Sequence, residues 1–161
     1  THGFDDEGRQ FDPTGNLRDW WSPKVGAEFD RRAACVVEQY NGFVPVENLH
    51  LDGKLTLGEN IADLGGLKLA LHGFRNAAKK APIPPPSGSE FSEEQLFFLG
   101  FAQSWCEKRR TEYSRMLVTL DSHSPPEFRV NGPLSNLPEF AAAWKCKAGD
   151  KMVRQNLCAI W

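Results

Sequence analysis

The sequence lacks a hydrophobic run long enough to cross a lipid bilayer. Its longest apolar stretch, residues 96–102, is far shorter than the roughly 20 residues that a membrane-spanning helix requires. The sequence also shows no signal peptide, and it begins at Thr1 rather than at a methionine. We therefore expect no membrane span in these residues, and we expect them to be part of a longer protein, in which any anchor or export signal would lie upstream.

The sequence has no excess of positive charge. Its formal net charge is -2 at pH 7 and its pI is about 6.1, so it lacks the basic field with which nucleic-acid-binding domains attract phosphates. We expect no nucleic-acid partner. The chain has 161 residues, of which 40% are hydrophobic and 25% charged. This composition is typical of one globular domain or of a large piece of one.

The sequence also lacks a C-x-x-C pair of the kind that binds zinc or performs redox chemistry. Its cysteines are instead far apart, at Cys35, Cys106, Cys146 and Cys158. Disulfides are the favoured interpretation, either as two internal bridges or with partners outside this chain, and buried free thiols are the alternative. Disulfides would indicate an oxidising compartment.

Hydrophobic periodicity predicts a mainly α-helical chain with few or no strands. Helices are expected over residues 23–40, 55–80, 92–115 and 135–145. The Ser22-Pro23 pair predicts the start of the first helix, and Ser92 with Gln95 predicts a capping box before a buried helix. Residues 1–20 are rich in turn formers and predict a loop. The proline-rich residues 81–91 predict a surface connector inside a single unit, residues 1–161.

The helix expected from residue 55 carries two carboxylates, Glu59 and Asp63, one turn apart on one face. Like charges at this spacing repel by a few tenths of a kcal/mol on an exposed helix, so the pair indicates a cation or a separate role for each group. Small residues continue this face and predict close approach of another element, at Gly66, Ala70 and Gly73. The alternative is that Thr56 and Glu59 form a capping box and that Asp63 is a solvated acid.

A second group of polar residues surrounds the Ser-Pro-Pro turn at residues 124–126. Asp121, His123 and Arg129 gather there, and a rigid turn suits side chains that must meet a substrate at fixed geometry. An ordinary polar loop is the alternative, because loops often collect such residues.

Four segments resemble, in the same order, the C-terminal half of the catalytic region of the neprilysin and endothelin-converting-enzyme family of zinc metalloendopeptidases. They are residues 1–9 (THGFDDEGR), 58–67 (GENIADLGGL), 121–129 (DSHSPPEFR) and 158–161 (CAIW). The resemblance covers nearly the whole chain. It implies the distal half of a thermolysin-like (gluzincin) catalytic lobe, one Zn²⁺ ion, peptide substrates, and an extracellular or cell-surface location, which in a bacterium would be periplasmic or secreted.

The resemblance also implies roles for individual residues. The family holds zinc with an H-E-x-x-H helix and a downstream glutamate, so His2 would be the last histidine of that motif and Glu59 the third protein ligand. Asp63 and His123 would belong to the catalytic machinery. Asp63 would accept a hydrogen bond from a ligating imidazole, and His123 would stabilise the oxyanion formed when zinc-activated water attacks the peptide bond. Arg129 would bind a substrate carbonyl.

Two further acids, Asp121 and Asp5, are candidates to orient His123. The first histidine and the general-base glutamate of H-E-x-x-H would lie before Thr1. We therefore expect the parent protein to be the peptidase, with a preference for an apolar residue after the scissile bond, and the isolated chain to be inactive. A non-catalytic helical interaction module, or a pseudoenzyme fragment on the same scaffold, is the alternative.

The resemblance finally implies a disulfide pairing. Cys35 would bond to Cys158 and hold the C-terminal tail on the helix of residues 23–40. Cys106 and Cys146 would pair with cysteines in the absent N-terminal part of the same protein, which would make that part a covalent partner of this chain.

Overall fold

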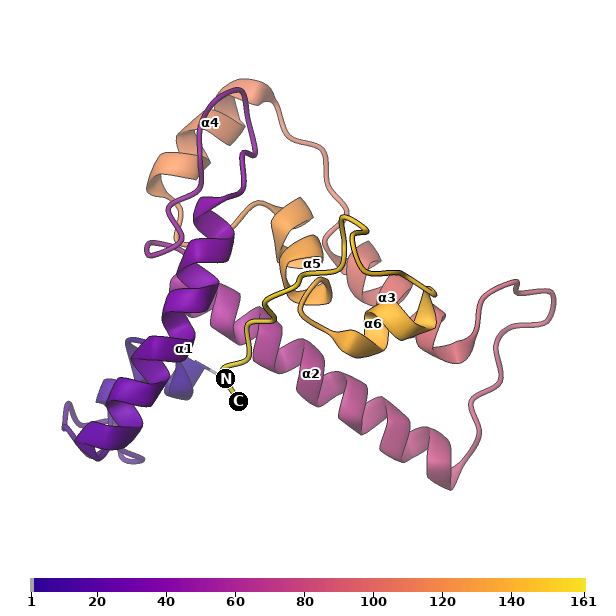
Figure 1. Cartoon of the computed structure of the whole chain (residues 1–161), viewed down its shortest axis with the longest axis horizontal. Helices are drawn as coiled ribbons and strands as arrows, with labels where there is room; N and C mark the ends of the chain where they lie inside the picture. The colour runs from indigo at the N-terminus through magenta and orange to yellow at the C-terminus, as the bar shows by residue number, and fades with distance from the viewer. Residues whose placement is uncertain (1) are drawn as a thin grey trace.

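Residues 2–161 are described by a computed structural model, in which helices and loops make up almost the whole chain (Figure 1). The helices are η1 (His2–Phe4), η2 (Gly8–Gln10), α1 (Pro23–Asn41), α2 (Leu57–Lys80), α3 (Glu93–Ser104), α4 (Thr111–Leu120), α5 (Pro126–Leu134) and α6 (Pro138–Ala143). The β structure described in these residues consists of two isolated bridges, Phe11–Leu17 and Val46–Leu49. The prediction of a mainly α-helical fold is therefore confirmed.

Among residues 2–161, no helix combines the length and the apolar character that crossing a bilayer demands.

Helix α1 begins where the sequence predicts. The Ser22 hydroxyl accepts a hydrogen bond from the Val25 amide at 3.4 Å, and Pro23 occupies the first turn, where its missing N–H leaves no bond unmade. The two short helices η1 and η2 interrupt the loop expected over residues 1–20. One face of α1 is buried and contributes four residues to a cluster of the hydrophobic core: Phe29, Ala33, Val36 and Tyr40.

Helix α2 is the longest helix and packs against α1 and α5 (Figure 1). Its apolar stripe is buried, as the periodicity predicts, at Leu57, Ile61, Leu64, Leu67 and Leu71. The expectation of a close neighbour on the small-residue face is wrong for this chain. A Cβ atom built on Gly66 or on Gly73 would meet no atom within 4 Å among the described residues.

The capping box that was the alternative interpretation at Thr56 is absent. Thr56 makes no side-chain cap bond, because its backbone (φ -96°, ψ 6°) lacks the extended conformation that a capping residue takes. Its hydroxyl instead donates to the Asp52 carbonyl oxygen at 3.0 Å and accepts from the Asn60 side chain at 2.9 Å. The carboxylate of Glu59 is therefore free of a capping role and takes part in the contacts described below.

Helices α3 and α6 differ in extent from the prediction, and α4 and α5 are separate helices that the sequence analysis did not predict. The capping box of Ser92 and Gln95 is present, with hydrogen bonds of 2.9 and 3.3 Å. Of the residues of α3 only Phe98 is buried, although the helix contacts α6 and, through Phe97 and Phe74, also α2. Helix α3 also ends at Ser104, and the polar residues that follow form a loop before α4. The helix expected over residues 135–145 is shorter, since α6 begins at Pro138.

The C-terminal tail is fastened to α1 and α2. A disulfide joins Cys35 of α1 to Cys158, which is the pair that the resemblance implies, and Lys68 Nζ donates to the Trp161 carbonyl oxygen at 2.8 Å. Helix η1 lies beside the C-terminal residue (Figure 1), with the rings of Phe4 and Trp161 6.0 Å apart. Helix η1 also contacts α2 directly, through His2 and Glu59.

Candidate metal and substrate site

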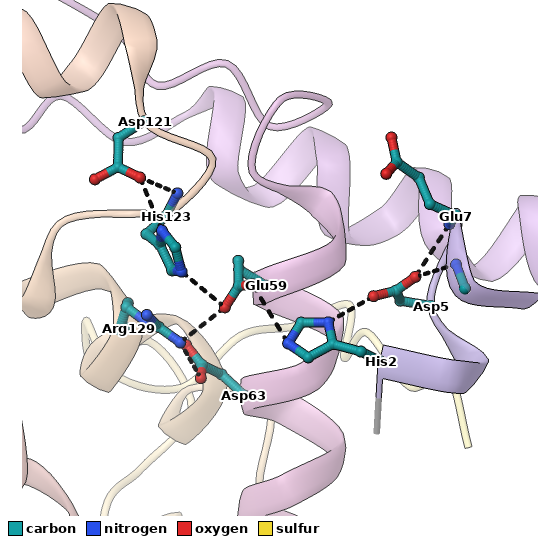
Figure 2. Close-up of polar contacts among 9 residues, drawn as sticks. His2, Asp5, Glu7, Glu59, Asp63, Asp121, His123 and Arg129 are labelled. Atoms are coloured by element: carbon teal, nitrogen blue, oxygen red, sulfur yellow. Dashed lines mark hydrogen bonds and ion pairs between the residues drawn. The ribbon is translucent and has the colours of Figure 1, made fainter.

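Glu59 lies at the centre of a polar cluster that is built from four segments (Figure 2). One carboxylate oxygen lies 3.3 Å from His2 Nε2 of η1. The other lies 3.4 Å from His123 Nε2, in the loop after α4, and 3.2 Å from Arg129 Nη2 of α5. The first turn of α2 thus brings together residues that are far apart in the sequence, and the negative charge of Glu59 suits the N-terminal end of a helix.

His2 is oriented by Asp5. The ring nitrogen Nδ1 lies 2.7 Å from Asp5 Oδ2, and the other oxygen of Asp5 accepts from the amides of Glu7 and Gly8 at 3.0 and 2.7 Å. A carboxylate that accepts from Nδ1–H leaves the lone pair of Nε2 free and pointing at Glu59, as a metal-ligating histidine requires. Asp5 therefore contacts His2, whereas the sequence raised it as a partner of His123.

Gly58 allows the loop of Asp5 and Asp6 to approach α2, and sequence reasoning gave it no role. A Cβ atom at this position would lie 3.2 Å from an oxygen of each aspartate. Burial raises the pKa of Asp6, whose Oδ1 atom is buried without a partner among residues 2–161. The signal was available in the sequence, because Gly58 directly precedes Glu59 in the GEN motif.

Asp63 pairs with Arg129. The guanidinium donates from Nε to Asp63 Oδ2 at 2.7 Å and from Nη2 to Oδ1 at 2.8 Å, a two-bond arrangement for which arginine is suited. Burial raises the pKa of Asp63, and the guanidinium offsets this only in part. Burial also disfavours the charged guanidinium, but hydrogen bonds and charge from Asp63 hold the pKa of Arg129 above its usual value. Among the described residues, Arg129 is therefore the partner of Asp63, and no imidazole is.

The opposite face of the Arg129 side chain packs on Trp105. The guanidinium carbon lies 4.0 Å from the centroid of the indole ring, in a cation–π arrangement. The contacts with Asp63 and Glu59 use Nε and Nη2, and they leave Nη1 without a hydrogen-bond partner within residues 2–161. Arg129 is thus held rigidly with one donor group to spare. The sequence offers no local signal for the role of Trp105, which lies beyond the end of α3.

His123 is held by Asp121. Asp121 Oδ1 accepts from the His123 amide at 3.0 Å and lies 2.8 Å from ring nitrogen Nδ1. Although burial opposes it, these hydrogen bonds lower the pKa of Asp121. The second ring nitrogen, Nε2, then points toward Glu59 (Figure 2). Of the two acids proposed to orient His123, Asp121 is the one in contact with it.

The donors present suit part of a zinc site. Within residues 2–161 no group of three or more His, Cys, Asp or Glu side chains is arranged to hold a metal. His2 Nε2 and a Glu59 oxygen nevertheless converge at the edge of a polar cavity of about 270 Å³, and one imidazole nitrogen with one carboxylate oxygen is a combination that Zn²⁺ accepts. This chain therefore provides two donors of the required kind.

Comparison with known proteins places relatives of this chain among metallopeptidases. The model of peptidase family M13 matches residues 1–160. An endothelin-converting enzyme homolog of Locusta migratoria is 47% identical over 163 residues, which cover 100% of this chain and 22% of the relative. Neprilysin-1 of Caenorhabditis elegans is 45% identical over 165 residues, with the same two coverages. The chain thus spans about a fifth of the length of these relatives.

A solved structure shares the fold. The crystal structure of Mycobacterium tuberculosis zinc metalloprotease ZMP1 in complex with an inhibitor superposes with a TM-score of 0.91 and 36% sequence identity. The match covers 99% of this chain and 25% of that chain. A cryo-EM structure of the same protease in an open state gives a TM-score of 0.88 and covers 99% of this chain and 26% of that one.

Proposed function

The chain belongs to peptidase family M13, and from this premise we propose that it is part of a zinc-dependent metalloendopeptidase that hydrolyses peptide bonds in peptides. The observation that carries the proposal is the convergence on Glu59 of His2 Nε2, His123 Nε2 and Arg129. A candidate metal ligand, a candidate donor to an oxyanion and a candidate substrate-binding cation thereby share one centre. No contact among the described residues favours the non-catalytic interaction module.

In this proposal His2 Nε2 and Glu59 are two of the three protein ligands of a Zn²⁺ ion. The third ligand and the general-base glutamate would belong to the H-E-x-x-H motif of which His2 is the last residue. Bound there, the ion would act as a Lewis acid that polarises the scissile carbonyl group. Asp5 fixes the orientation of the His2 ring through the 2.7 Å contact with Nδ1.

His123 and Arg129 would act on the substrate directly. With Asp121 accepting from Nδ1–H, a second proton on Nε2, which makes the ring an imidazolium, would let His123 donate a hydrogen bond to the oxyanion that develops during attack on the peptide carbonyl. Arg129 would donate from its spare Nη1 group to a backbone carbonyl of the bound peptide. The buried contacts of Arg129 with Asp63 and Trp105 support this role, because they hold the donor in place before the substrate arrives.

Asp63 would have two partners in the intact protein. It contacts Arg129 here, and the resemblance additionally implies a hydrogen bond to a zinc-ligating imidazole of the H-E-x-x-H motif. Such a dual contact would link substrate binding to ligand orientation. Neither role requires Asp63 to touch the reacting atoms, so it would act by positioning the groups beside it.

The intact protein would be extracellular or located at the cell surface. The disulfide between Cys35 and Cys158 supports an oxidising compartment. Cys106 and Cys146 have no disulfide partner among residues 2–161, and in this proposal they bond to cysteines in the N-terminal part of the same protein. The isolated chain would be catalytically inactive, since it would supply neither the general base nor the third ligand.

Metal analysis and a peptidase assay on the full-length protein test the proposal. The expected result is about one zinc ion per molecule, activity on a fluorogenic peptide that 1,10-phenanthroline abolishes, and loss of both zinc and activity in Glu59→Gln. Glu90→Gln, an exposed change in the connector between α2 and α3, is the matched control and should retain both. Full zinc occupancy and activity in Glu59→Gln, or a wild-type protein without zinc, would overturn it.

A further inference from the structure

We propose that Ser124 and Asn60 are positioning residues, which hold the loop of His123 against α2 and thereby set the distance between His123 and Glu59. The inference rests on the proposed function, since it concerns the same site. It adds two residues to which the sequence motifs assign no chemistry.

A continuous series of hydrogen bonds, of which the first two are buried, connects the loop to α2 and to the segment before it. The Ser124 hydroxyl donates to Asn60 Oδ1 at 2.7 Å, and Asn60 Nδ2 donates to Thr56 Oγ1 at 2.9 Å. Thr56 Oγ1 then donates to the carbonyl oxygen of Asp52 at 3.0 Å. The exposed fractions of Ser124, Asn60 and Thr56 are only 2%, 1% and 2%. The side chains of Ser124, Asn60 and Thr56 therefore all have hydrogen-bond partners within the protein, and this requirement fixes the geometry of the series.

The positions of Ser124 and Asn60 in the sequence show how this series of hydrogen bonds is connected to the site. Ser124 directly follows His123, and Asn60 directly follows Glu59. Successive residues of an α-helix point about 100° apart, so Glu59 reaches into the polar cluster while Asn60 points into the protein interior. The hydrogen bond between Ser124 and Asn60 thus joins the residues next to His123 and Glu59, and it controls the distance between those two side chains.

Other contacts of His123 are too weak or too local to replace this bond. Asp121 belongs to the same loop and would move with His123. The contact of His123 with Glu59 is 3.4 Å long, and the His123 side chain is 47% exposed, where water competes with it. Removing the Ser124 hydroxyl would leave Asn60 Oδ1 buried and unsatisfied, so the loop would shift or admit water to restore a partner.

The first test measures the kinetics of full-length Ser124→Ala. We expect kcat to fall about 10- to 100-fold, the effect of a displacement of about 1 Å at a catalytic group, while KM changes little because Arg129 still binds the substrate. In a His123→Ala background, Ser124→Ala should cause no further loss. A residue that acts only through general stability would reduce kcat equally in both backgrounds, and that result would overturn the proposal.

Two further variants distinguish a loss of positioning from a general folding defect. Ser135→Ala is the matched control, because Ser135 is also a buried serine that donates to a backbone carbonyl and accepts from an amide, at Gly132 and Gln39, but it has no contact with the site. It should keep the wild-type kcat. Ser124→Cys is nearly isosteric and donates only weakly, so it should lower kcat in the same direction by a smaller factor if Ser124→Ala does not fold.

Amide hydrogen exchange provides a readout that does not depend on catalysis. In Ser124→Ala or Ser124→Cys we expect the amides of residues 121–124 to exchange at least about tenfold faster, while the amides of α2 keep their wild-type rates. Unchanged exchange in the loop would refute the positioning role. If the wild-type protein cleaves no peptide, the proposed function fails, and hydrogen exchange still decides whether the buried bond holds the loop.

Discussion

Arg129 lies between two carboxylates, so its replacement measures how strongly the buried ion pair stabilises the site. We predict that Arg129→Met lowers the free energy of unfolding by about 3 to 5 kcal/mol, the cost of breaking a buried pair by removing one partner. The structure supports this range, because Arg129 and Asp63 share two hydrogen bonds of 2.7 and 2.8 Å and their side chains are only 12% and 9% exposed. Methionine keeps the packing on Trp105, so the loss reports charge rather than volume.

The double variant Asp63→Asn/Arg129→Met should recover at least about 2 kcal/mol of this loss, because no unpaired charge is left buried at that position. Arg115→Met is the matched control. Arg115 pairs with Glu47 at the surface, where the two side chains are 47% and 52% exposed. Arg115→Met should therefore lower the free energy of unfolding by at most about 1 kcal/mol.

Urea unfolding of the full-length protein, followed by circular dichroism, provides the midpoints and slopes for these comparisons. Equal losses in Arg129→Met and Arg115→Met would contradict the reasoning. So would a double variant whose loss is the sum of the two single losses, because additivity would mean that the two side chains do not stabilise each other.

Two further changes follow from the surroundings of the site. Gly58→Ala should lower the affinity for zinc about 10- to 100-fold, because the new methyl group would press on Asp5, which orients His2. An unchanged zinc dissociation constant in a titration of this variant would contradict the prediction. Hydrogen bonds from two neighbouring arginines lower the pKa of Glu28 from 4.5 to about 2. The stabilisation that ionised Glu28 contributes is therefore complete above pH 4.5 and is lost as the pH falls toward 2. Over this interval the melting temperature should fall less in Glu28→Gln than in the wild type.

Helix positions were predictable where the signals are local. The caps at Ser22 and Ser92 act on amides three residues away, and the apolar stripe of α2 repeats within a turn or two. The capping box at Thr56 shows the limit of such signals. The same residues that fit a cap also fit hydrogen bonds of Thr56 with Asp52 and Asn60, and the tertiary packing of α2 selects the second arrangement.

The contacts between the site residues were less predictable from the sequence than the identity of those residues. The sequence placed Glu59, Asp63 and Arg129 in one functional region, but spacing carries no information on which acid meets which base. Asp63 and Arg129 are 66 residues apart along the chain, and His2 and Glu59 likewise belong to different helices. Such pairs depend on how separate helices dock.

The sequence by itself determined the helical class of this protein and its family, because hydrophobic periodicity, helix caps and short motifs are all relations between neighbouring residues. Only the tertiary structure decided the contacts of Glu59, which receives His2, His123 and Arg129 from three different segments. Those distances follow from the packing of α2 against α5 and from buried bonds such as Ser124 to Asn60. Long-range contacts of this kind form when apolar faces and buried polar groups find partners together, and no local pattern encodes them.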